Sequence, residues 1–382
     1  MRILAVDVGT GTQDILLFDS EREVENNFKM VMPSPTVMLA QATRAATRRG
    51  DDLLLTGVTM GGGPCGWAVE DHLKAGHVVY ATPDAARTFN DDLNRVADMG
   101  VTLVSEDEAA TIDGQVTRLR MADFDYQAIA AAFDRFGVSL DRDLDGIAVA
   151  VFDHGHAPPE VSDRLFRFRY LEERLRAGNR LSTFAFLAAD VPPIMTRMQA
   201  VAATTPREDI PLLLMDTAPA AVLGALQDHA LSKRRPVIVA NVGNFHCLAF
   251  RMGQDGELDG VESIEGVFEH HSGKLNAEGL EDLLDRLAEG SITNKEVFES
   301  NGHGAVLFCD EAIPPQDRHV VVTGPRRGLL RHSRWSVHFA TPFGDMMLAG
   351  CYGLVRAYGQ IVVEAGEAID RALAGGGGRS LW

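Results

Sequence analysis

The stretch Val6-Asp7-Val8-Gly9-Thr10-Gly11-Thr12-Gln13-Asp14 joins two aliphatic runs, residues 3–8 and 15–18. Its Gly9-x-Gly11 start is typical of a dinucleotide-binding turn, but Asp14 stands where that turn has its third glycine. A dinucleotide turn also has to open a helix whose N-terminus holds the pyrophosphate, whereas a second strand pattern follows Asp14. The stretch therefore predicts a strand–turn–strand and excludes a Rossmann dinucleotide site.

A strand–turn–strand of this composition has a chemical use. The backbone N–H groups of a Gly/Thr turn can form a concave site for the terminal phosphates of a nucleotide. Asp7, at the end of the first strand, could then hold Mg²⁺ through water, because that ion keeps most of its hydration shell. An ordinary hairpin with a structural aspartate explains the segment equally well, so both interpretations stay open at this point.

Aliphatic segments alternate with helical patterns along the chain, which indicates an α/β fold. We expect strands at residues 3–8, 15–18, 53–58, 77–81, 146–152, 212–215, 237–241, 247–251, 305–308 and 319–323. We expect helices at residues 34–49, 67–74, 88–98, 126–136, 159–177, 193–203, 218–231 and 280–288. A last helical stretch covers residues 343–373, and its small residues allow it to be two helices.

Length and charge limit the classes of function. The 382 residues suggest two domains at about 150 residues each. A formal net charge of −18 opposes binding to nucleic acid and to anionic membrane surfaces. No apolar run approaches the roughly 20 residues that span a bilayer. We therefore expect a cytoplasmic protein whose partner is a small molecule or another protein, and the oligomeric state stays open.

Four later segments, together with the strand–turn–strand at residues 3–18, form an ordered set of five. They are a small-residue helix at 214–226, a second strand–turn–strand at 236–250, a strand with a glycine turn at 320–327, and another small-residue helix at 344–354. In this order the five segments resemble the signatures of the acetate and sugar kinase/Hsp70/actin superfamily. The resemblance implies two ribonuclease-H-like domains that enclose ATP and Mg²⁺ in a cleft.

The resemblance also implies roles for individual residues. Asp7 would anchor Mg²⁺ and act in catalysis, and both turns would hold the nucleotide. The nucleotide-binding residues would be Gly9, Thr10, Gly11, Thr12, Asn241, Gly243, Asn244, Thr323 and Gly324. Asn241 departs from the pattern because most relatives carry Asp there, and an amide is neither a base nor an anionic metal anchor. Pro325 departs too, because it replaces a glycine and removes an N–H group. Both departures bear on ATP hydrolysis.

On this interpretation, residues 1–230 form the first domain, with a substrate-side insertion around 60–210. Residues 231–374 form the second domain, and residues 375–382 form a flexible tail. Within the superfamily, segments 59–64, 152–155 and 215–221 are most similar to a prokaryotic family labelled "putative pyruvate formate-lyase activating enzyme". A radical activating enzyme needs a CxxxCxxC ligand set. The four cysteines are widely separated, so we do not expect that activity.

Asp153-His154-Gly155-His156 follows the strand at 146–152, where α/β proteins place ligand residues. The resemblance to sugar kinases makes this loop the wall of the second-substrate site, with Asp153 as general base and His154 as a polar contact or proton donor. Alternatively, Asp153, His154 and His156 bind a transition metal with His246, His270 or His271.

Three hypotheses follow from the sequence. The first is a Mg-ATP-dependent phosphotransferase or ATPase with an unidentified second substrate. The second is a non-catalytic nucleotide-sensing scaffold, which Asn241 and Pro325 suggest. The third is a metal-dependent hydrolase that uses Asp153, His154 and His156.

Overall fold

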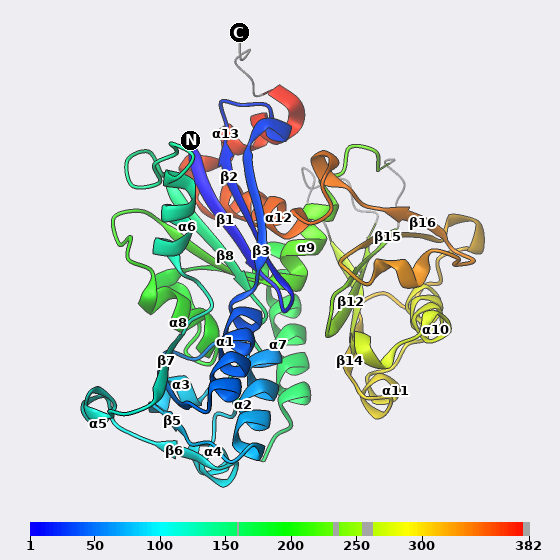
Figure 1. Cartoon of the computed structure of the whole chain (residues 1–382). Helices are drawn as coiled ribbons and strands as arrows, with labels where there is room; N and C mark the ends of the chain where they lie inside the picture. The colour runs from blue at the N-terminus through cyan, green and yellow to red at the C-terminus, as the bar shows by residue number, and fades with distance from the viewer. Residues whose placement is uncertain (159, 232–236, 254–262, 377–382) are drawn as a thin grey trace.

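The computed structural model describes residues 1–158, 160–231, 237–253 and 263–376. Two six-stranded sheets form the centres of two halves of the molecule, and a smaller four-stranded sheet lies beside the first (Figure 1). Residues 232–236, next to the predicted domain boundary, and the tail residues 377–382 lie outside the described residues.

The first half is built on a sheet with the strand order β3-β2-β1-β8-β10-β9. Strands β1, β2 and β3 are antiparallel neighbours, β1, β8 and β10 are parallel, and β9 pairs antiparallel with β10. Their bounds are β1 (Arg2–Val8), β2 (Thr12–Asp19), β3 (Phe28–Pro33), β8 (Gly146–Val151), β9 (Ala185–Leu187) and β10 (Leu212–Asp216).

The second half repeats this plan in the order β14-β13-β12-β11-β15-β16. Strands β11 to β14 are antiparallel neighbours, while β11, β15 and β16 are parallel. Their bounds are β11 (Val237–Val242), β12 (His246–Met252), β13 (Ile264–His271), β14 (Gly302–Leu307), β15 (His319–Thr323) and β16 (Ser336–Phe339). Five strands in the same order and directions in both sheets confirm the predicted α/β class with two ribonuclease-H-like halves.

The third sheet is entirely parallel, in the order β6-β5-β4-β7. Its strands are β4 (Asp52–Gly57), β5 (Val79–Ala81), β6 (Val101–Leu103) and β7 (Val116–Met121). This unit enters the chain between β3 and β8 and therefore begins before residue 60. Strand β8, inside the range predicted for the insertion, is a central strand of the first sheet. The domain bounds themselves stay a prediction.

Thirteen α-helices occur in the described residues. They are α1 (Pro35–Arg49), α2 (Pro64–Lys74), α3 (Pro83–Ala86), α4 (Leu93–Asp98), α5 (Glu106–Thr111), α6 (Tyr126–Asp134), α7 (Asp163–Gly178), α8 (Thr196–Thr204), α9 (Thr217–Ala225), α10 (Ala277–Ala288), α11 (Asn294–Glu299), α12 (Ala349–Ile361) and α13 (Val363–Arg371). Local chemistry sets many of their ends. Helix α1, for example, begins at a proline, whose missing N–H costs nothing there, and ends at Gly50 with φ of 77°. The predicted helical stretch at 343–373 is divided at Val362, as its small residues allowed.

Helices α9 and α12 cross at their glycines. A Cβ on Gly224 would overlap the carbonyl of Ala349, and a Cβ on Gly353 would overlap the carbonyl of Ala220. Only residues without side chains allow two helix backbones to approach so closely, which explains the small residues of both helices. Helix α12 also packs against β1 and β8, so the last helices of the chain return to the first half (Figure 1).

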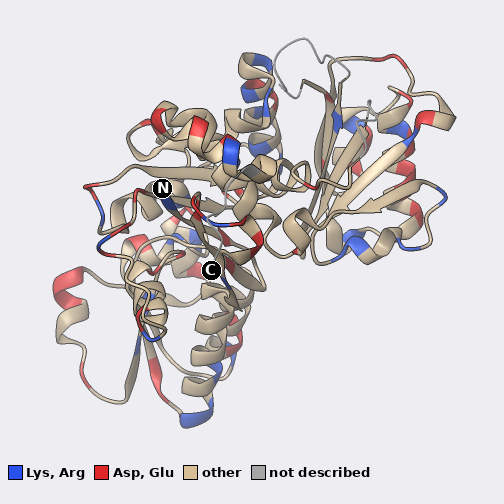
Figure 2. Ribbon diagram, turned by 90° about the horizontal axis from the view of Figure 1, so that it is seen from above, with Lys and Arg blue, Asp and Glu red and all other residues tan. Residues whose placement is uncertain are grey.

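The surface carries both signs of charge. Figure 2 shows acidic and basic residues on both halves and on the third sheet. Among the described helices, none is both long and apolar enough to cross a membrane.

Candidate functional site

Two backbone turns of the same geometry end the first hairpin of each main sheet. In the first turn, residues 9–12 between β1 and β2, the Gly9 N–H donates to the Thr12 carbonyl at 2.9 Å. In the second turn, residues 243–246 between β11 and β12, the Gly243 N–H donates to the His246 carbonyl at 2.8 Å. A serine N–H closes each turn from outside: Ser34 donates to Gly11, and Ser272 donates to Phe245. The two hairpins are therefore structural equivalents.

Both turns line one cleft of about 1060 Å³ between the halves. A Cβ on Gly11 would lie 3.0 Å from the side-chain nitrogen of Asn244, so the turns come into contact across it. The cleft is lined by all the residues predicted from the sequence for nucleotide, metal and catalysis, namely Asp7, Gly9, Thr10, Gly11, Thr12, Asn241, Gly243, Asn244, Thr323, Gly324, Asp153 and His154.

Two buried carboxylates stand behind the first turn. Asp7 and Asp14 face each other in the register of β1 and β2, and each is 7% exposed. One oxygen of each has no hydrogen-bond partner among the described residues. Burial raises the pKa of Asp7 well above its usual value, and the Asp14 charge adds to this. Burial also raises the pKa of Asp14 to about 7. We predicted no role for Asp14 from the sequence. The signal was the register of a tight hairpin, which places Asp14 opposite Asp7.

The predicted glycine turn at 320–327, which carries Thr323 and Gly324, is attached to the second turn. Gly324 has φ of 93°, and a Cβ there would lie 2.6 Å from the Asn241 side-chain oxygen. The Arg326 N–H donates to the Val242 carbonyl at 3.0 Å. Only glycine fits at residue 324, for both conformational and steric reasons. Pro325, which lacks an N–H, also lines the cleft.

A glycine loop at 61–63, before α2, forms another wall of the cleft. The Gly61 N–H donates to Asp123 at 3.0 Å, and Asp123 also binds Arg197 through two bonds of 2.8 and 2.9 Å. Gly63 has φ of 49° and packs against the ring of Phe245. This wall therefore touches the second turn directly. The ion pair that supports it joins residues 74 positions apart, so no local pattern could have indicated it.

Both carboxylate oxygens of Asp153 accept hydrogen bonds from the backbone. One carboxylate oxygen accepts from the Gly155 N–H at 2.9 Å, and the other accepts from the Met198 N–H at 3.0 Å. The side chain is 1% exposed, and burial raises its pKa. Asp153 thus holds the loop after β8 to the start of α8. Each oxygen keeps a further lone pair, so the role of general base stays a prediction for Asp153.

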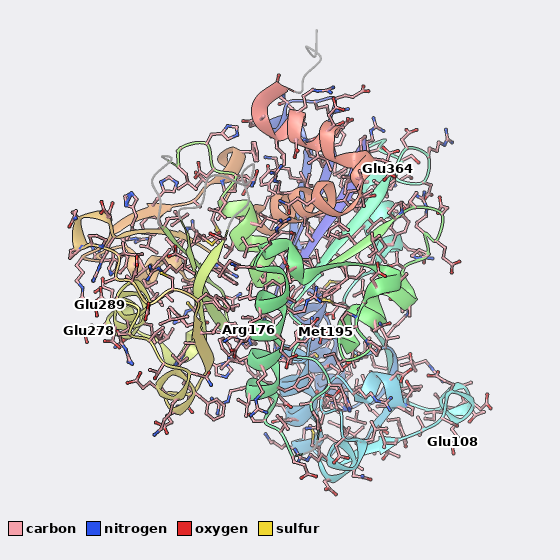
Figure 3. All side chains as sticks on the ribbon, turned by 180° about the vertical axis from the view of Figure 1, so that it is seen from behind. Glu108, Arg176, Met195, Glu278, Glu289 and Glu364 are labelled. Atoms are coloured by element: carbon pink, nitrogen blue, oxygen red, sulfur yellow. The ribbon has the colours of Figure 1, made fainter. Side chains whose placement is uncertain are left out.

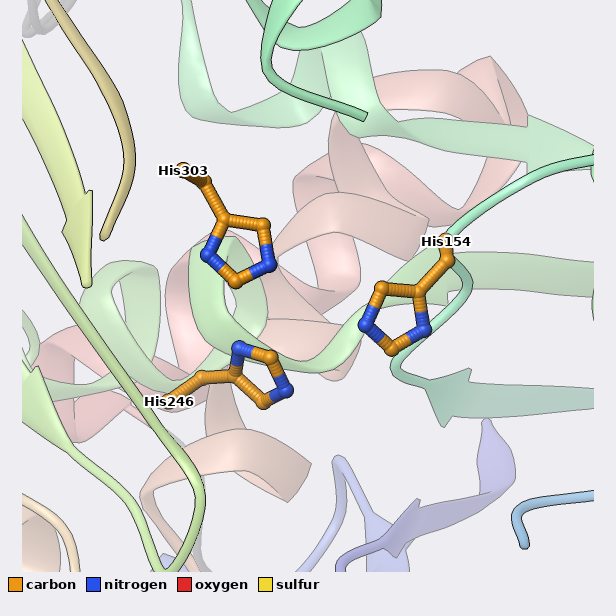
Figure 4. Close-up of side chains that lie close together, drawn as sticks. All are labelled: His154, His246 and His303. Atoms are coloured by element: carbon orange, nitrogen blue, oxygen red, sulfur yellow. The ribbon is translucent and has the colours of Figure 1, made fainter. Parts of the chain in front are cut away.

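The histidines are arranged differently from the predicted metal set. His156 is directed to Asp91, with 3.4 Å between its Nδ1 and a carboxylate oxygen, and His270 bonds to Ser300. His154 instead meets His246 and His303, and one ring nitrogen of each lies within 4.8 Å of the others (Figure 4). Of the residues predicted for a metal, the structure therefore brings His154 and His246 together and adds His303, while Asp153 and His156 make other contacts. We call His154, His246 and His303 the histidine cluster.

His303 was missed because the predicted strand began at residue 305, whereas β14 begins at Gly302. Burial lowers the pKa of His154 well below its usual range and that of His303 to about 3. Burial also lowers the pKa of the neighbouring His271 to about 4. These imidazoles are therefore neutral at pH 7.

A buried ion network lies behind the histidine cluster. Glu269 of β13 is fully buried, and its Oε1 lies 3.5 Å from Nδ1 of His246 and 3.8 Å from Nδ1 of His303. Arg167 of α7 donates to Glu269 at 2.9 Å and to Asp216 at 2.7 Å. Figure 3 shows α7 at the boundary between the halves, with Arg176 labelled near its end. Arg167 therefore links a carboxylate of the first half to one of the second.

The four cysteines lie on separate elements. Cys65 is in α2, Cys247 in β12 and Cys351 in α12, all buried, while Cys309 follows β14. They do not form the group of thiolates that an iron–sulfur cluster requires.

Comparisons with known proteins place the chain in a family without giving it an activity. A search of curated proteins found no match. One similar solved structure is an exopolyphosphatase-like protein, 9% identical, with a TM-score of 0.28, covering 100% of this chain and 93% of its own. Another is a ligand-bound xylulose kinase from Lactobacillus acidophilus, 10% identical, with a TM-score of 0.27, covering 98% and 95%. A family model described as "Putative pyruvate format-lyase activating enzyme (DUF1786)" matches residues 60–329, more than two thirds of the chain, and the protein therefore belongs to this family.

Proposed function

We propose that this protein binds ATP with Mg²⁺ between the first and second turns and uses it to phosphorylate a small molecule or to drive work on a partner. The observation that carries the proposal is the pair of equivalent glycine turns that meet across one cleft, with Asp7 at the base of the first. Backbone N–H groups in such turns bind the oxygens of phosphates without needing a positively charged surface.

The carboxylates behind the first turn suit a hydrated magnesium ion. Two buried like charges disfavour each other's ionisation, and one oxygen of Asp7 has no partner among the described residues. A divalent cation held through water would remove this repulsion and satisfy the free oxygen. Asp7 is the proposed anchor, and Asp14 adds negative charge from the facing strand. Bound magnesium would neutralise the charge of the phosphates during transfer.

Catalysis in such a site rests on positioning and charge neutralisation. Asn241 occupies the place in the second turn that Asp7 occupies in the first, and its amide cannot take a proton from water or from a substrate. We therefore assign the second turn to nucleotide binding. The same residue supports the second candidate function, a nucleotide sensor that binds ATP and turns it over very slowly.

We also propose a cytoplasmic setting and a partner that is not a nucleic acid or a membrane. The support is the net charge of −18, which repels both polyanionic surfaces.

Titration calorimetry with ATP in millimolar Mg²⁺ tests the binding, and release of ADP tests the turnover. Asp7→Asn keeps the shape of the side chain and should weaken Mg-ATP binding about 10- to 100-fold, the effect of losing one interaction with a charged group. Asp134→Asn, on the exposed end of α6, is the matched control and should bind like the wild type. No heat with the wild-type chain would overturn the proposal. Binding without ADP release would favour the sensor.

A further inference from the structure

Three histidines from distant parts of the chain converge on one point of the cleft wall. His154 comes from the loop after β8 of the first half, His246 begins β12, and His303 lies in β14 of the second half. One nitrogen of each lies within 4.8 Å of the other two (Figure 4). All three line the cleft, so the point where they meet is accessible from it.

The ring nitrogens lack the partners that buried histidines usually have. Both nitrogens of His303 and Nδ1 of His246 are buried without a hydrogen bond to any described residue. The two Nδ1 atoms do lie 3.8 and 3.5 Å from the Glu269 carboxylate, whereas Nε2 of His303 has neither a hydrogen bond nor an ion pair among these residues. Buried polar atoms are normally paired, and those that have no partner in the protein often mark the place of a bound ion or water. A cluster of core histidines packed only as aromatic rings would leave these atoms unsatisfied.

We propose that His154, His246 and His303 bind a transition-metal ion of the zinc type, with a further coordination position open to the cleft. Three imidazoles are a sufficient protein ligand set for a zinc centre that keeps one position for water or substrate. Its ligands are imidazole nitrogens and not carboxylate oxygens, which distinguishes this site from the Mg²⁺ site proposed beside Asp7.

Glu269 is the second observation that supports a metal. Ligating histidines commonly have a carboxylate behind them that sets the tautomer and the direction of the ring. Glu269 lies behind both His246 and His303, and its bond to Arg167 keeps it ionised inside the protein. Burial opposes ionisation, but the Arg167 charge holds the pKa of Glu269 well below its usual range.

The position of the site suggests its use. The open position is directed to the cleft that the two turns share, so the metal would act as a Lewis acid on an oxygen of the second substrate, a carboxylate, carbonyl or hydroxyl. Because His154 belongs to one half and His246 and His303 to the other, the ion would also tie the halves together. Binding of the metal does not depend on the proposed nucleotide function.

The test uses the full chain, treated with a chelator, dialysed, and titrated with Zn²⁺ and Co²⁺ in the absence of nucleotide. We expect one equivalent of Zn²⁺ by calorimetry, a rise in the unfolding temperature, and a visible absorption band with Co²⁺ from nitrogen ligation. His246→Gln and His303→Gln should each weaken Zn²⁺ binding about 100-fold or more, since loss of a group that only hydrogen-bonds to a ligand already costs about 10- to 100-fold.

His156→Gln is the matched control, because this residue lies two positions from His154 but is directed to Asp91. It should bind Zn²⁺ like the wild type. Circular dichroism and unfolding without metal establish that each variant is folded, and the Co²⁺ spectrum of the wild type needs no variant at all. Absence of a stoichiometric site in the wild type, or an equal loss in His156→Gln, would overturn the proposal. Since no nucleotide is present, either result leaves the test of ATP binding unaffected.

Discussion

The first and second turns have the same backbone and opposite side-chain chemistry. The residue at the end of the leading strand is Asp7 in one and Asn241 in the other, and the residue that faces it in the register is Asp14 or Leu248. Where the first turn closes on Thr12, the second closes on His246. The first turn therefore lies next to two carboxylates, those of Asp7 and Asp14, whereas the second turn ends at the imidazole of His246.

The comparison separates what the fold provides from what each half adds. Backbone N–H groups for an anion belong to both turns, because both keep a glycine and the same closing hydrogen bonds. The ionisable groups differ between the turns: aspartates accompany the first, and a histidine closes the second. The acidic turn suits a hydrated cation, while the turn with histidine suits a softer metal. Arg167 connects the two halves, because its guanidinium group donates to Asp216 of the first half and to Glu269 of the second.

Removing this link should have the largest effect. Arg167→Met keeps much of the side-chain volume but leaves Asp216 and Glu269 as unpaired buried carboxylates. We expect a loss of about 3–5 kcal/mol in the free energy of unfolding, measured by urea denaturation. Arg176→Met on the same helix removes a more exposed pair with Glu172 and should cost less than about 1 kcal/mol. Equal losses in the two variants would mean that the Arg167 network does not hold the halves together.

The acidic character of the first turn should appear in the pH dependence of stability. Asp14 has a folded pKa of about 7, raised by burial, whereas an aspartate in an unfolded chain has a pKa of about 3.9. Between these values the unfolded chain binds fewer protons at Asp14 than the folded one, so the contribution of Asp14 to stability falls as the pH rises and levels off above pH 7. Asp14→Asn should remove this fall. Its stability relative to wild type should increase by about 3 kcal/mol from pH 5 to pH 8, two units of titration.

Urea unfolding at several pH values, with a chelator and without nucleotide, measures this difference. Asp134→Asn provides the control because its side chain is exposed, and its curve should run parallel to that of the wild type. If the curve of Asp14→Asn also ran parallel to that of the wild type, the buried charge of Asp14 would not destabilise the first turn. The first turn would then resemble the second, where Leu248 stands at the equivalent position.

The parts of the fold that could be predicted are those with a local signal. The sequences of β1, β8, β10 and β11 are continuous aliphatic runs. The sequences of α9 and α12 are rich in small residues, which are typical of helices that cross closely. The two glycine turns follow from glycine next to a strand. These elements predicted the α/β class, and the family that their order resembles implied two halves with the nucleotide residues in one cleft.

The parts that could not be predicted depend on contacts between distant residues. Strand β13 carries Glu269, His270 and His271, a polar end typical of a loop, and its burial depends on Arg167 from the other half. Strand β7 has an arginine at every second position from residue 118 to residue 120, and among the described residues it pairs with β4 of the third sheet. Asp153 follows a strand, as a catalytic residue would, and only the fold shows that Gly155 and Met198 occupy its oxygens. His303 had no neighbour in sequence to indicate its role.

The smallest expected difference is the most direct test of whether the two turns are equivalent. Ser34 and Ser272 close the first and second turns with the same backbone bond, and both are fully buried. The Ser34 hydroxyl also donates to the Thr10 carbonyl at 2.7 Å, whereas the Ser272 hydroxyl has no partner among the described residues. Ser34→Ala should therefore cost about 1 kcal/mol in urea unfolding, the usual net value of one hydrogen bond. Ser272→Ala should cost nothing or stabilise slightly, because it removes an unsatisfied buried hydroxyl. If both variants lost the same free energy, the serines would act through their backbones alone, and the first turn would not be the more firmly held of the two.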